Sequence, residues 1–313
     1  MSYQILDVTP DTPEWYEKRR EGLGASDTAA ILGLSKWSTP LAVYMSKHGV
    51  ERDFDPMIAW VGHEQEPVIA KWITTFHPEV GRLLPGFAAQ SGEWPWLFAT
   101  PDRVADDVGL LIPVELKTSM EFAREGWADG VPLYYQVQVQ QQIAVLGAPY
   151  GWLAVFHGGR DFELHKIARD DDFIDNHLVP KTREFWETHV QALVPPEPTT
   201  SQEAVDLWPG DPELTIEGGE DLLELWGAYG LMQAEQIEVT ESLENVKLEL
   251  QTAMQEATAL THDGQTLFTW KPRKGATRLD VEALKADHPD IHSAYLKQGA
   301  PTRTFLRKKV DDK

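Results

Sequence analysis

The sequence predicts an α/β protein with a mixed central β-sheet flanked by helices, followed by a long helix and a small α+β appendage. The run Leu110–Lys117 is short, apolar and rich in strand-forming residues. Segments 59–72 and 131–147, on either side of it, have helical spacing of their apolar residues. From Asp221 onward, apolar residues recur at heptad spacing. With 313 residues, 42% of them hydrophobic, the chain can bury one large core and still carry an appendage.

The first predicted helix follows an aromatic and basic turn, Trp15–Arg20. We expect Ser26 or Asp27 to cap this helix, which runs through Ile31 and Leu32. Free backbone N–H groups at a helix start, beside a guanidinium and a serine hydroxyl, can bind a phosphate. A capped helix with solvated arginines would give the same pattern.

The next helix, predicted over Ala59–Trp72, carries Glu66. This glutamate could point toward a metal ion, although a lone glutamate on a helix usually faces solvent. His63 is interpreted as a structural or surface histidine, because Mg²⁺ sites seldom contain imidazole. The apolar face of the helix is expected to include Val61, Val68, Ile69 and Trp72.

Two carboxylates and an ammonium group meet around the strand Leu110–Lys117. Period-two alternation places Glu115 and Lys117 on one face, and Asp102 can approach from a neighbouring strand. Mg²⁺ prefers carboxylate oxygens and keeps water ligands that can be deprotonated for attack on phosphorus. Lys117 would orient that water or neutralise charge in the transition state. The pattern predicts phosphodiester cleavage, but ordinary surface ion pairs on a strand would look the same.

A glutamine-rich helix is predicted from Val131 to Gly147. Tyr135, Gln138 and Gln142 recur at helical spacing and therefore share one face. Uncharged amides beside a metal can hold water or a phosphate oxygen without competing for the metal. The alternative is a merely polar helix face.

The proline-rich stretch Val194–Thr200 marks a domain boundary, because adjacent prolines forbid helix and favour an extended spacer. We expect a core over residues 1–193, a linker over 194–218 and an extension over 219–313. The extension opens with a helix predicted over Asp221–Leu260. Its heptad stripe fits either a coiled coil between protomers or packing within its own domain.

A small α+β unit is predicted after this helix. Asp263 and Gly264 signal a tight turn before the strand Leu267–Trp270, and a helix from Val281 and a strand at Thr304–Leu306 follow. Basic residues of this tail could contact DNA or a partner, or could only make the surface soluble. They are Lys271, Arg273, Lys274, Arg278, Arg303, Arg307, Lys308 and Lys309.

Composition excludes several classes of protein. The chain has no cysteine, which excludes disulfides, thiolate metal sites and cysteine nucleophiles. We find neither an apolar run of roughly twenty residues nor the pattern of a signal peptide, and so expect no membrane association and a cytoplasmic protein. The net charge of −22 opposes DNA binding, but residues 266–313 carry 11 Lys and Arg against 6 Asp and Glu. The basic charge is therefore local.

Taken together, these motifs resemble the YqaJ-like viral recombinases, the family of phage lambda exonuclease and RecE-like phage exonucleases within the PD-(D/E)XK nuclease superfamily. The resemblance covers about residues 13–190. Its motifs are Trp15–Arg19 with Gly24-Ala25-Ser26, Gly62-x-x-x-Glu66, Thr100-Pro101-Asp102, Glu115-Leu116-Lys117 and Tyr135-x-x-Gln138-Val139-Gln140.

The resemblance implies a restriction-endonuclease-like core and assigns catalytic roles. It implies that Glu66, Asp102 and Glu115 bind the metal, Mg²⁺, for which Mn²⁺ can substitute. Lys117 would support a general base or orient water, and Gln138 would lie beside the acidic cluster. Glu64 could take the place of Glu66.

The resemblance also implies substrate contacts. Arg19 and Ser26 fall at positions that recognise a terminal 5′-phosphate, and Arg20 could replace Arg19. Thr100 stands where lambda exonuclease has a serine, and Tyr135 would contact DNA. Asp102 and Glu115 are spaced a little wider than the corresponding residues of lambda exonuclease, and a hairpin around Asp106–Gly109 would accommodate the difference.

The implied activity is 5′-to-3′ digestion of one strand of linear double-stranded DNA to mononucleotides. It leaves 3′ overhangs for phage recombination in a bacterial host. The resemblance further implies a homo-oligomeric ring, a trimer before a tetramer, and a single-strand annealing recombinase as partner. Two alternatives stay open. One is a structure-specific or restriction-like endonuclease, which would not need Arg19, and the other is a non-catalytic DNA-end-binding scaffold.

Overall fold

The computed structural model describes residues 3–10, 12–50, 55–299 and 302–308. The chain forms two compact units, Met1–Ala204 and Val205–Lys313, and the division falls inside the predicted linker. Among the described helices, none is both long and apolar enough to cross a lipid bilayer.

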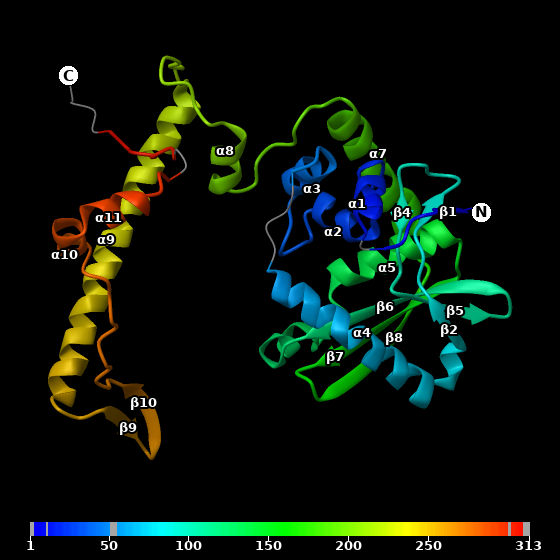
Figure 1. Cartoon of the computed structure of the whole chain (residues 1–313), viewed down its shortest axis with the longest axis horizontal. Helices are drawn as coiled ribbons and strands as arrows, with labels where there is room; N and C mark the ends of the chain where they lie inside the picture. The colour runs from blue at the N-terminus through cyan, green and yellow to red at the C-terminus, as the bar shows by residue number, and fades with distance from the viewer. Residues whose placement is uncertain (1–2, 11, 51–54, 300–301, 309–313) are drawn as a thin grey trace. The chain divides into compact units, whose positions relative to one another are not determined.

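A five-stranded sheet lies at the centre of the first unit, with the strand order β2-β5-β6-β7-β8 (Figure 1). Strands β6 and β7 run parallel, and the other neighbouring pairs are antiparallel. This mixed sheet, flanked by helices, confirms the predicted fold class. The elements are β2 (Arg82–Pro85), β5 (Arg103–Asp107), β6 (Leu110–Ser119), β7 (Tyr150–His157), β8 (Asp161–Ala168), α4 (Pro56–Phe76) and α5 (Leu133–Leu146).

Helices α4 and α5 cover opposite faces of this sheet. Leu153 of β7 packs with Ile143 of α5. The next residue, Ala154, points the other way and packs in the cluster that contains Ile69 of α4. Helix α5 is the connection between the parallel strands β6 and β7, and its last turn ends at Gly147 in the left-handed conformation (φ 67°).

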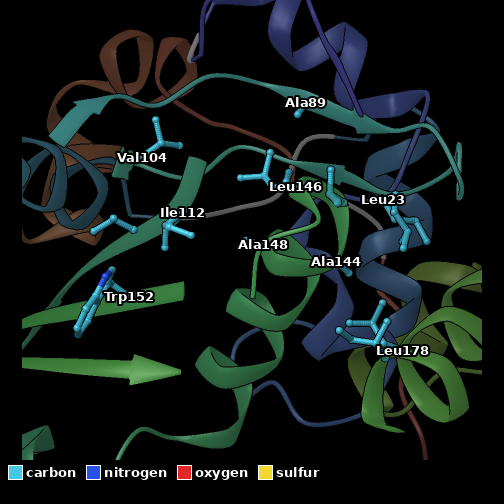
Figure 2. Packing of buried hydrophobic residues seen from close by; sticks show 14 of the residues in the cluster. Leu23, Ala89, Val104, Ile112, Ala144, Leu146, Ala148, Trp152 and Leu178 are labelled. Atoms are coloured by element: carbon cyan, nitrogen blue, oxygen red, sulfur yellow. The ribbon is translucent and has the colours of Figure 1, made fainter. Parts of the chain in front are cut away.

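A smaller layer packs beside the central sheet. It combines the three-stranded sheet β1-β3-β4 with three short helices. Leu23 bridges to Leu97 next to β4, and both are buried in the main core. Figure 2 shows Leu23 together with Ala144 and Leu146 from α5 in this core. The elements are β1 (Tyr3–Ile5), β3 (Ala89–Ser91), β4 (Phe98–Ala99), α1 (Pro13–Arg20), α2 (Ala25–Ile31) and α3 (Pro40–Lys47).

Several local predictions for this region were wrong. The predicted turn at Trp15 is the helix α1, capped by the Thr12 hydroxyl. Helix α2 is capped by Gly24 rather than by Ser26 or Asp27, and Asp27 instead accepts a hydrogen bond from the Gly24 N–H at 3.0 Å. Val68, predicted on the apolar face of α4, is 50% exposed.

The remaining helical segments of the first unit lie around these layers. The stretch from Asp171 to Gln191 is continuously helical and includes two π-helical turns. The segments are η1 (Pro78–Val80), η2 (Glu121–Trp127), α6 (Asp171–Phe173), η3 (Ile174–Leu178), α7 (Val179–Phe185) and η4 (Trp186–Gln191). The predicted linker is not wholly extended, because it contains the helix α8 (Ser201–Leu207).

The second unit is built on the long helix α9 (Glu220–Met254). The helix ends six residues before the predicted Leu260, because Gln255 adopts a positive φ of 47° and the chain turns into a hairpin. Within the described residues, no strand forms at Thr304–Leu306, and Lys309 lies outside them. The other elements are β9 (Ala259–His262), β10 (Gln265–Thr269), α10 (Val281–Asp287) and α11 (Pro289–Ala294).

Candidate active site

A cavity of about 450 Å³ brings together seven of the nine predicted site residues. An adjoining cavity of about 260 Å³ contains Lys117 and shares Glu66 and Asp102 with the first. Tyr135 reaches the site through Lys117, whose ammonium nitrogen lies 5.1 Å from the centre of the tyrosine ring. The seven residues that line the larger cavity are Arg19, Ser26, Glu66, Thr100, Asp102, Glu115 and Gln138.

Glu115 is the most constrained carboxylate of the site. It lies on the central strand β6 and is only 2% exposed. One carboxylate oxygen accepts hydrogen bonds from Lys117 Nζ at 2.6 Å and Gln138 Nε2 at 2.5 Å. The other accepts a hydrogen bond from Gln142 Nε2 at 2.6 Å. Three donors therefore fix the orientation of this group.

Asp102 precedes β5 and meets Glu115 across the strand pair β5–β6. Its Oδ2 accepts a hydrogen bond from the backbone N–H of Leu116 at 2.7 Å. Burial raises the pKa of Asp102 well above its usual value, and the nearby carboxylates of Glu115 and Glu66 raise it further, although Lys117 opposes them. A second anion is thus unfavourable here unless a positive charge lies close by.

Lys117 supplies one such charge. Burial by itself would lower the pKa of Lys117, but the carboxylates of Glu115 and Asp102 outweigh burial and raise it. The side chain is therefore an ammonium ion at neutral pH. A charged ammonium can stabilise developing negative charge, whereas it has no lone pair with which to accept a proton.

Glu66 projects from α4 and lines the cavity together with Asp102. Its carboxylate lies 2.9 Å from His63 Nδ1 and 3.4 Å from Arg103 Nη1. The neighbouring Glu64 is exposed. The geometry places Glu66, rather than Glu64, beside the other carboxylates, and it gives Glu66 basic partners that the sequence did not indicate.

The chemistry of these donors fits a hard divalent cation. Buried carboxylate oxygens are the ligands that Mg²⁺ prefers, and a cation would relieve the repulsion that raises the pKa of Asp102. Within the described part of the chain, however, no three acidic or histidine side chains lie close enough together to hold a metal ion. Asp102 and Glu115 meet across the strand pair β5–β6, whereas Glu66 lines the same cavity from α4.

The opposite part of the cavity contains a guanidinium and two hydroxyl groups. Arg19 Nη2 donates a hydrogen bond to Ser26 Oγ at 3.0 Å, and the guanidinium carbon lies 4.7 Å from the centre of the Trp15 ring. A Cβ atom at Gly24 would come within 2.9 Å of Arg19 Nη2, so a larger residue at this position would displace the guanidinium. Arg19 lines the cavity with Thr100. Arg20 instead lies near Gly49.

A buried ion pair contacts both the backbone and the guanidinium of Arg19. Lys47 Nζ lies 2.7 Å from Asp27 Oδ2, and both side chains are almost completely buried. Lys47 Nζ also donates to the backbone oxygen of Arg19 at 2.9 Å, and Asp27 Oδ1 lies 3.6 Å from Arg19 Nη2. The pair thus connects α1, α2 and α3 near the C-terminal end of α1, where Arg19 lies.

The glutamines of α5 divide between the site and the core. Gln142, predicted to share one helix face with Tyr135 and Gln138, donates a hydrogen bond to Glu115 rather than to a water or a phosphate. Gln141 is fully buried and donates hydrogen bonds to the backbone oxygens of Leu23 and Phe98 at 2.8 and 2.9 Å. Gln140 donates to the Ala168 oxygen at 2.7 Å. Part of the glutamine enrichment therefore satisfies backbone carbonyls rather than the site.

Comparison with known proteins finds a family model that matches the part of the chain that contains this site. Residues 14–149 match the model of the YqaJ-like viral recombinase domain. The chain is also 28% identical over 302 residues to the uncharacterized protein YqaJ of Bacillus subtilis (strain 168), and this match covers 91% of each chain. These matches confirm the family resemblance predicted from the motifs.

Two solved structures are similar to part of the chain at low sequence identity. An alkaline exonuclease, LHK-Exo, from Laribacter hongkongensis is 18% identical, with a TM-score of 0.46, 63% of this chain covered and 100% of the other. A phage-related exonuclease from Haemophilus somnus 129PT is 12% identical, with a TM-score of 0.40, 55% of this chain covered and 96% of the other.

Proposed function

We propose that the protein is a metal-dependent exonuclease acting on linear double-stranded DNA, because residues 14–149 match the model of the YqaJ-like viral recombinase domain. Digestion of one strand would run from the 5′ end and release mononucleotides. The observation that carries this proposal is that two sets of residues, one suited to hydrolysis and one suited to phosphate binding, lie around one cavity. Asp102 and Glu115 with the adjacent Lys117 suit phosphodiester hydrolysis, and Arg19 with Ser26 suits a terminal phosphate.

In the proposed reaction, Asp102 and Glu115 hold Mg²⁺, or Mn²⁺ in its place, with Glu66 as a third candidate ligand. Bound Mg²⁺ would lower the pKa of a water ligand and offset charge on the scissile phosphate. Gln138 and Gln142 keep the Glu115 oxygens in one orientation.

Lys117 and the phosphate-binding residues complete the scheme. The Lys117 ammonium stabilises the extra negative charge on the phosphorus centre as the bond to the leaving oxygen breaks. Arg19 offers N–H donors to the 5′-phosphate, and the hydroxyls of Ser26 and Thr100 line the same cavity. An enzyme that reads a terminal phosphate would start at ends and would not cut closed circles.

The biological role that we propose is preparation of 3′ overhangs for recombination. The partner would be a single-strand annealing recombinase that coats the exposed strand. A homo-oligomeric ring, a trimer or alternatively a tetramer, would enclose the DNA and prevent its release between cuts, since closed symmetry leaves no gap.

A cleavage assay tests the proposal directly. Linear duplex DNA with a 5′-phosphate at one end is incubated with the protein in Mg²⁺ or in EDTA, beside a covalently closed circle. We expect metal-dependent loss of the phosphorylated strand and an intact circle. Lys117→Ala should lower the rate by about 100-fold or more, because one transition-state donor is lost.

Arg19→Ala, compared with the matched variant Arg20→Ala, separates the two enzymatic alternatives. An end-dependent exonuclease loses its preference for the 5′-phosphate in Arg19→Ala and keeps it in Arg20→Ala. Cleavage of the circle by the unmodified protein would instead identify an endonuclease. End binding without any cleavage in Mg²⁺ or Mn²⁺ would identify a scaffold.

A further inference from the structure

Four aromatic side chains form a continuous cluster that begins at the surface and passes beside Lys117. We call Trp37, Tyr134, Tyr135 and Trp127 the aromatic cluster. The Trp37 ring lies edge-on to Tyr134 at 4.8 Å and stacks against Tyr135 at 6.1 Å between ring centres. Tyr135 lies 4.4 Å from Tyr134 and 5.4 Å from Trp127.

Trp37 is the exposed end of this cluster. Its side chain is 68% exposed, whereas Trp127 at the inner end is 7% exposed. Burying an indole is strongly favourable, so an indole left in water is a candidate for contact with a ligand. The cavity residues that serve the proposed reaction do not include it.

The local backbone holds Trp37 in place. The N–H groups of Trp37 and Ser38 donate hydrogen bonds to Ser35 Oγ at 3.2 and 3.1 Å. This turn and the contacts with Tyr134 and Tyr135 fix the ring while leaving most of its surface free. A preformed aromatic surface loses little conformational entropy when a flat ligand stacks on it.

Positive charges lie beside two rings of the aromatic cluster. Lys36 Nζ is 5.8 Å from the centre of the Tyr134 ring, and Lys117 Nζ is 5.1 Å from that of Tyr135. Aromatic faces next to ammonium groups match a flexible chain that alternates flat bases with phosphates. A duplex keeps its bases stacked on each other, so an unpaired strand is the better match.

We propose that Trp37 and Tyr134 form a stacking platform for unpaired bases of DNA, next to the site of cleavage. The position of the platform relative to the reacting phosphate rests on the proposed function, through the contact of Tyr135 with Lys117. Recognition of the bases rests only on the cluster itself. Lys36 contributes attraction to the backbone phosphates.

Binding measured without cleavage tests the platform. The full-length protein is titrated in EDTA against a 3′-labelled oligodeoxythymidylate of about twelve nucleotides and against an abasic strand of equal length. The two strands carry the same phosphates, so the ratio of their dissociation constants reports on the bases alone. We expect the unmodified protein to prefer the strand with bases by about tenfold.

The variants locate that preference. Trp37→Ala should remove it and leave affinity for the abasic strand unchanged, and Trp37→Phe should retain most of it because a ring remains. Phe76→Ala is the matched control, since Phe76 is also 68% exposed, at the end of α4, and its loss should change neither affinity. Circular dichroism would show that each variant is folded.

The outcomes separate this inference from the proposed function. A preference that depends on Trp37 supports the platform even if the cleavage assay finds no nuclease. A preference that survives Trp37→Ala overturns the platform even if the protein is an exonuclease. Absence of any preference in the unmodified protein also overturns it, and the exposed indole would then belong to a protein contact.

Discussion

Lys47 and Asp27 form a buried ion pair that contacts Arg19. Each is almost fully buried, and the two are joined at 2.7 Å beneath Arg19. Taking two charges out of water is expensive, and such a pair is tolerated when both partners are present. Removal of one partner leaves the other as a buried charge with weaker compensation.

We therefore predict that Lys47→Met lowers the free energy of unfolding by about 3 kcal/mol. Urea denaturation checks this, with Lys181→Met as the control because the Lys181–Glu184 pair is exposed and should contribute nothing measurable. The double variant Asp27→Asn with Lys47→Met should recover part of the loss. Equal effects of Lys47→Met and Lys181→Met would contradict the prediction.

His157 gives the first unit a dependence on pH. The side chain is fully buried on β7, and neither ring nitrogen has a hydrogen-bond partner among the described residues. Burial lowers its pKa from the usual 6.5, and Arg124 and His165 act in the same direction, against Glu163 and Asp161. The folded protein therefore favours neutral imidazole.

Because the unfolded chain binds the proton more readily, stability is greatest above the unfolded pKa and falls as the pH drops below about 6.5. We predict that His157→Phe reduces this loss between about pH 7.5 and pH 5.5. Urea midpoints across that range measure it. An identical slope in the variant and the unmodified protein would show that other groups carry the dependence.

Single residues of the site differ in how well sequence predicts them. Glu115 and Lys117 follow from strand alternation, Asp102 from the expected approach of a neighbouring strand, and Gln138 from helix spacing. The pair Asp27–Lys47 does not, because its partners are far apart in sequence and neither lies in a pattern that signals burial. Arg103 likewise pairs with Glu66 only because two separate elements approach each other.

At the level of elements, the turn between β5 and β6 is a weak point of the fold. Val108 and Gly109 both have positive φ, 51° and 86°, so the two-residue turn is of the type that asparagine and glycine favour. Valine is β-branched and fits this backbone poorly, and its side chain is fully exposed. No packing compensates for the strain on the solvent side.

We predict that Val108→Asn stabilises the protein by about 1 kcal/mol. Chemical denaturation should show a higher midpoint with an unchanged slope. Val108→Ala serves as the comparison, because alanine removes the branch but still disfavours the left-handed region, and it should gain less. A lower midpoint for Val108→Asn would argue against strain at this turn.

The elements themselves were largely predictable, and their ends were not. The strand around Glu115 and the helices that became α4 and α5 follow from hydrophobic periodicity. Helix α9 ends at Met254, and the next residue, Gln255, has a positive φ that its residue type does not signal in the sequence. The run Thr304–Leu306 has strand-forming residues, but no described strand lies beside it, and a lone strand leaves its backbone groups unpaired.

For the whole molecule, the segment that follows the boundary between the two units can be detected by proteolysis. Residues 208–219 are exposed and contain neither helix nor strand. Proteases cut where backbone can leave the structure without breaking a core. We predict that a glutamate-specific protease cuts first at Glu213 or Glu217 and leaves the first unit intact, as mass spectrometry of a time course would show. Early cuts within β5 to β8 would contradict two separable units.

The parallel pairing of β6 with β7 also bears on how the protein is made. All nine predicted site residues leave the ribosome before Tyr150, the first residue of β7. Strand β6 is nevertheless buried only after α5 and β7 have been synthesised. The reason is that β7 pairs in parallel with β6, the strand that carries Glu115. An interrupted translation product that stops before His157 would thus possess every proposed catalytic residue and still be inert.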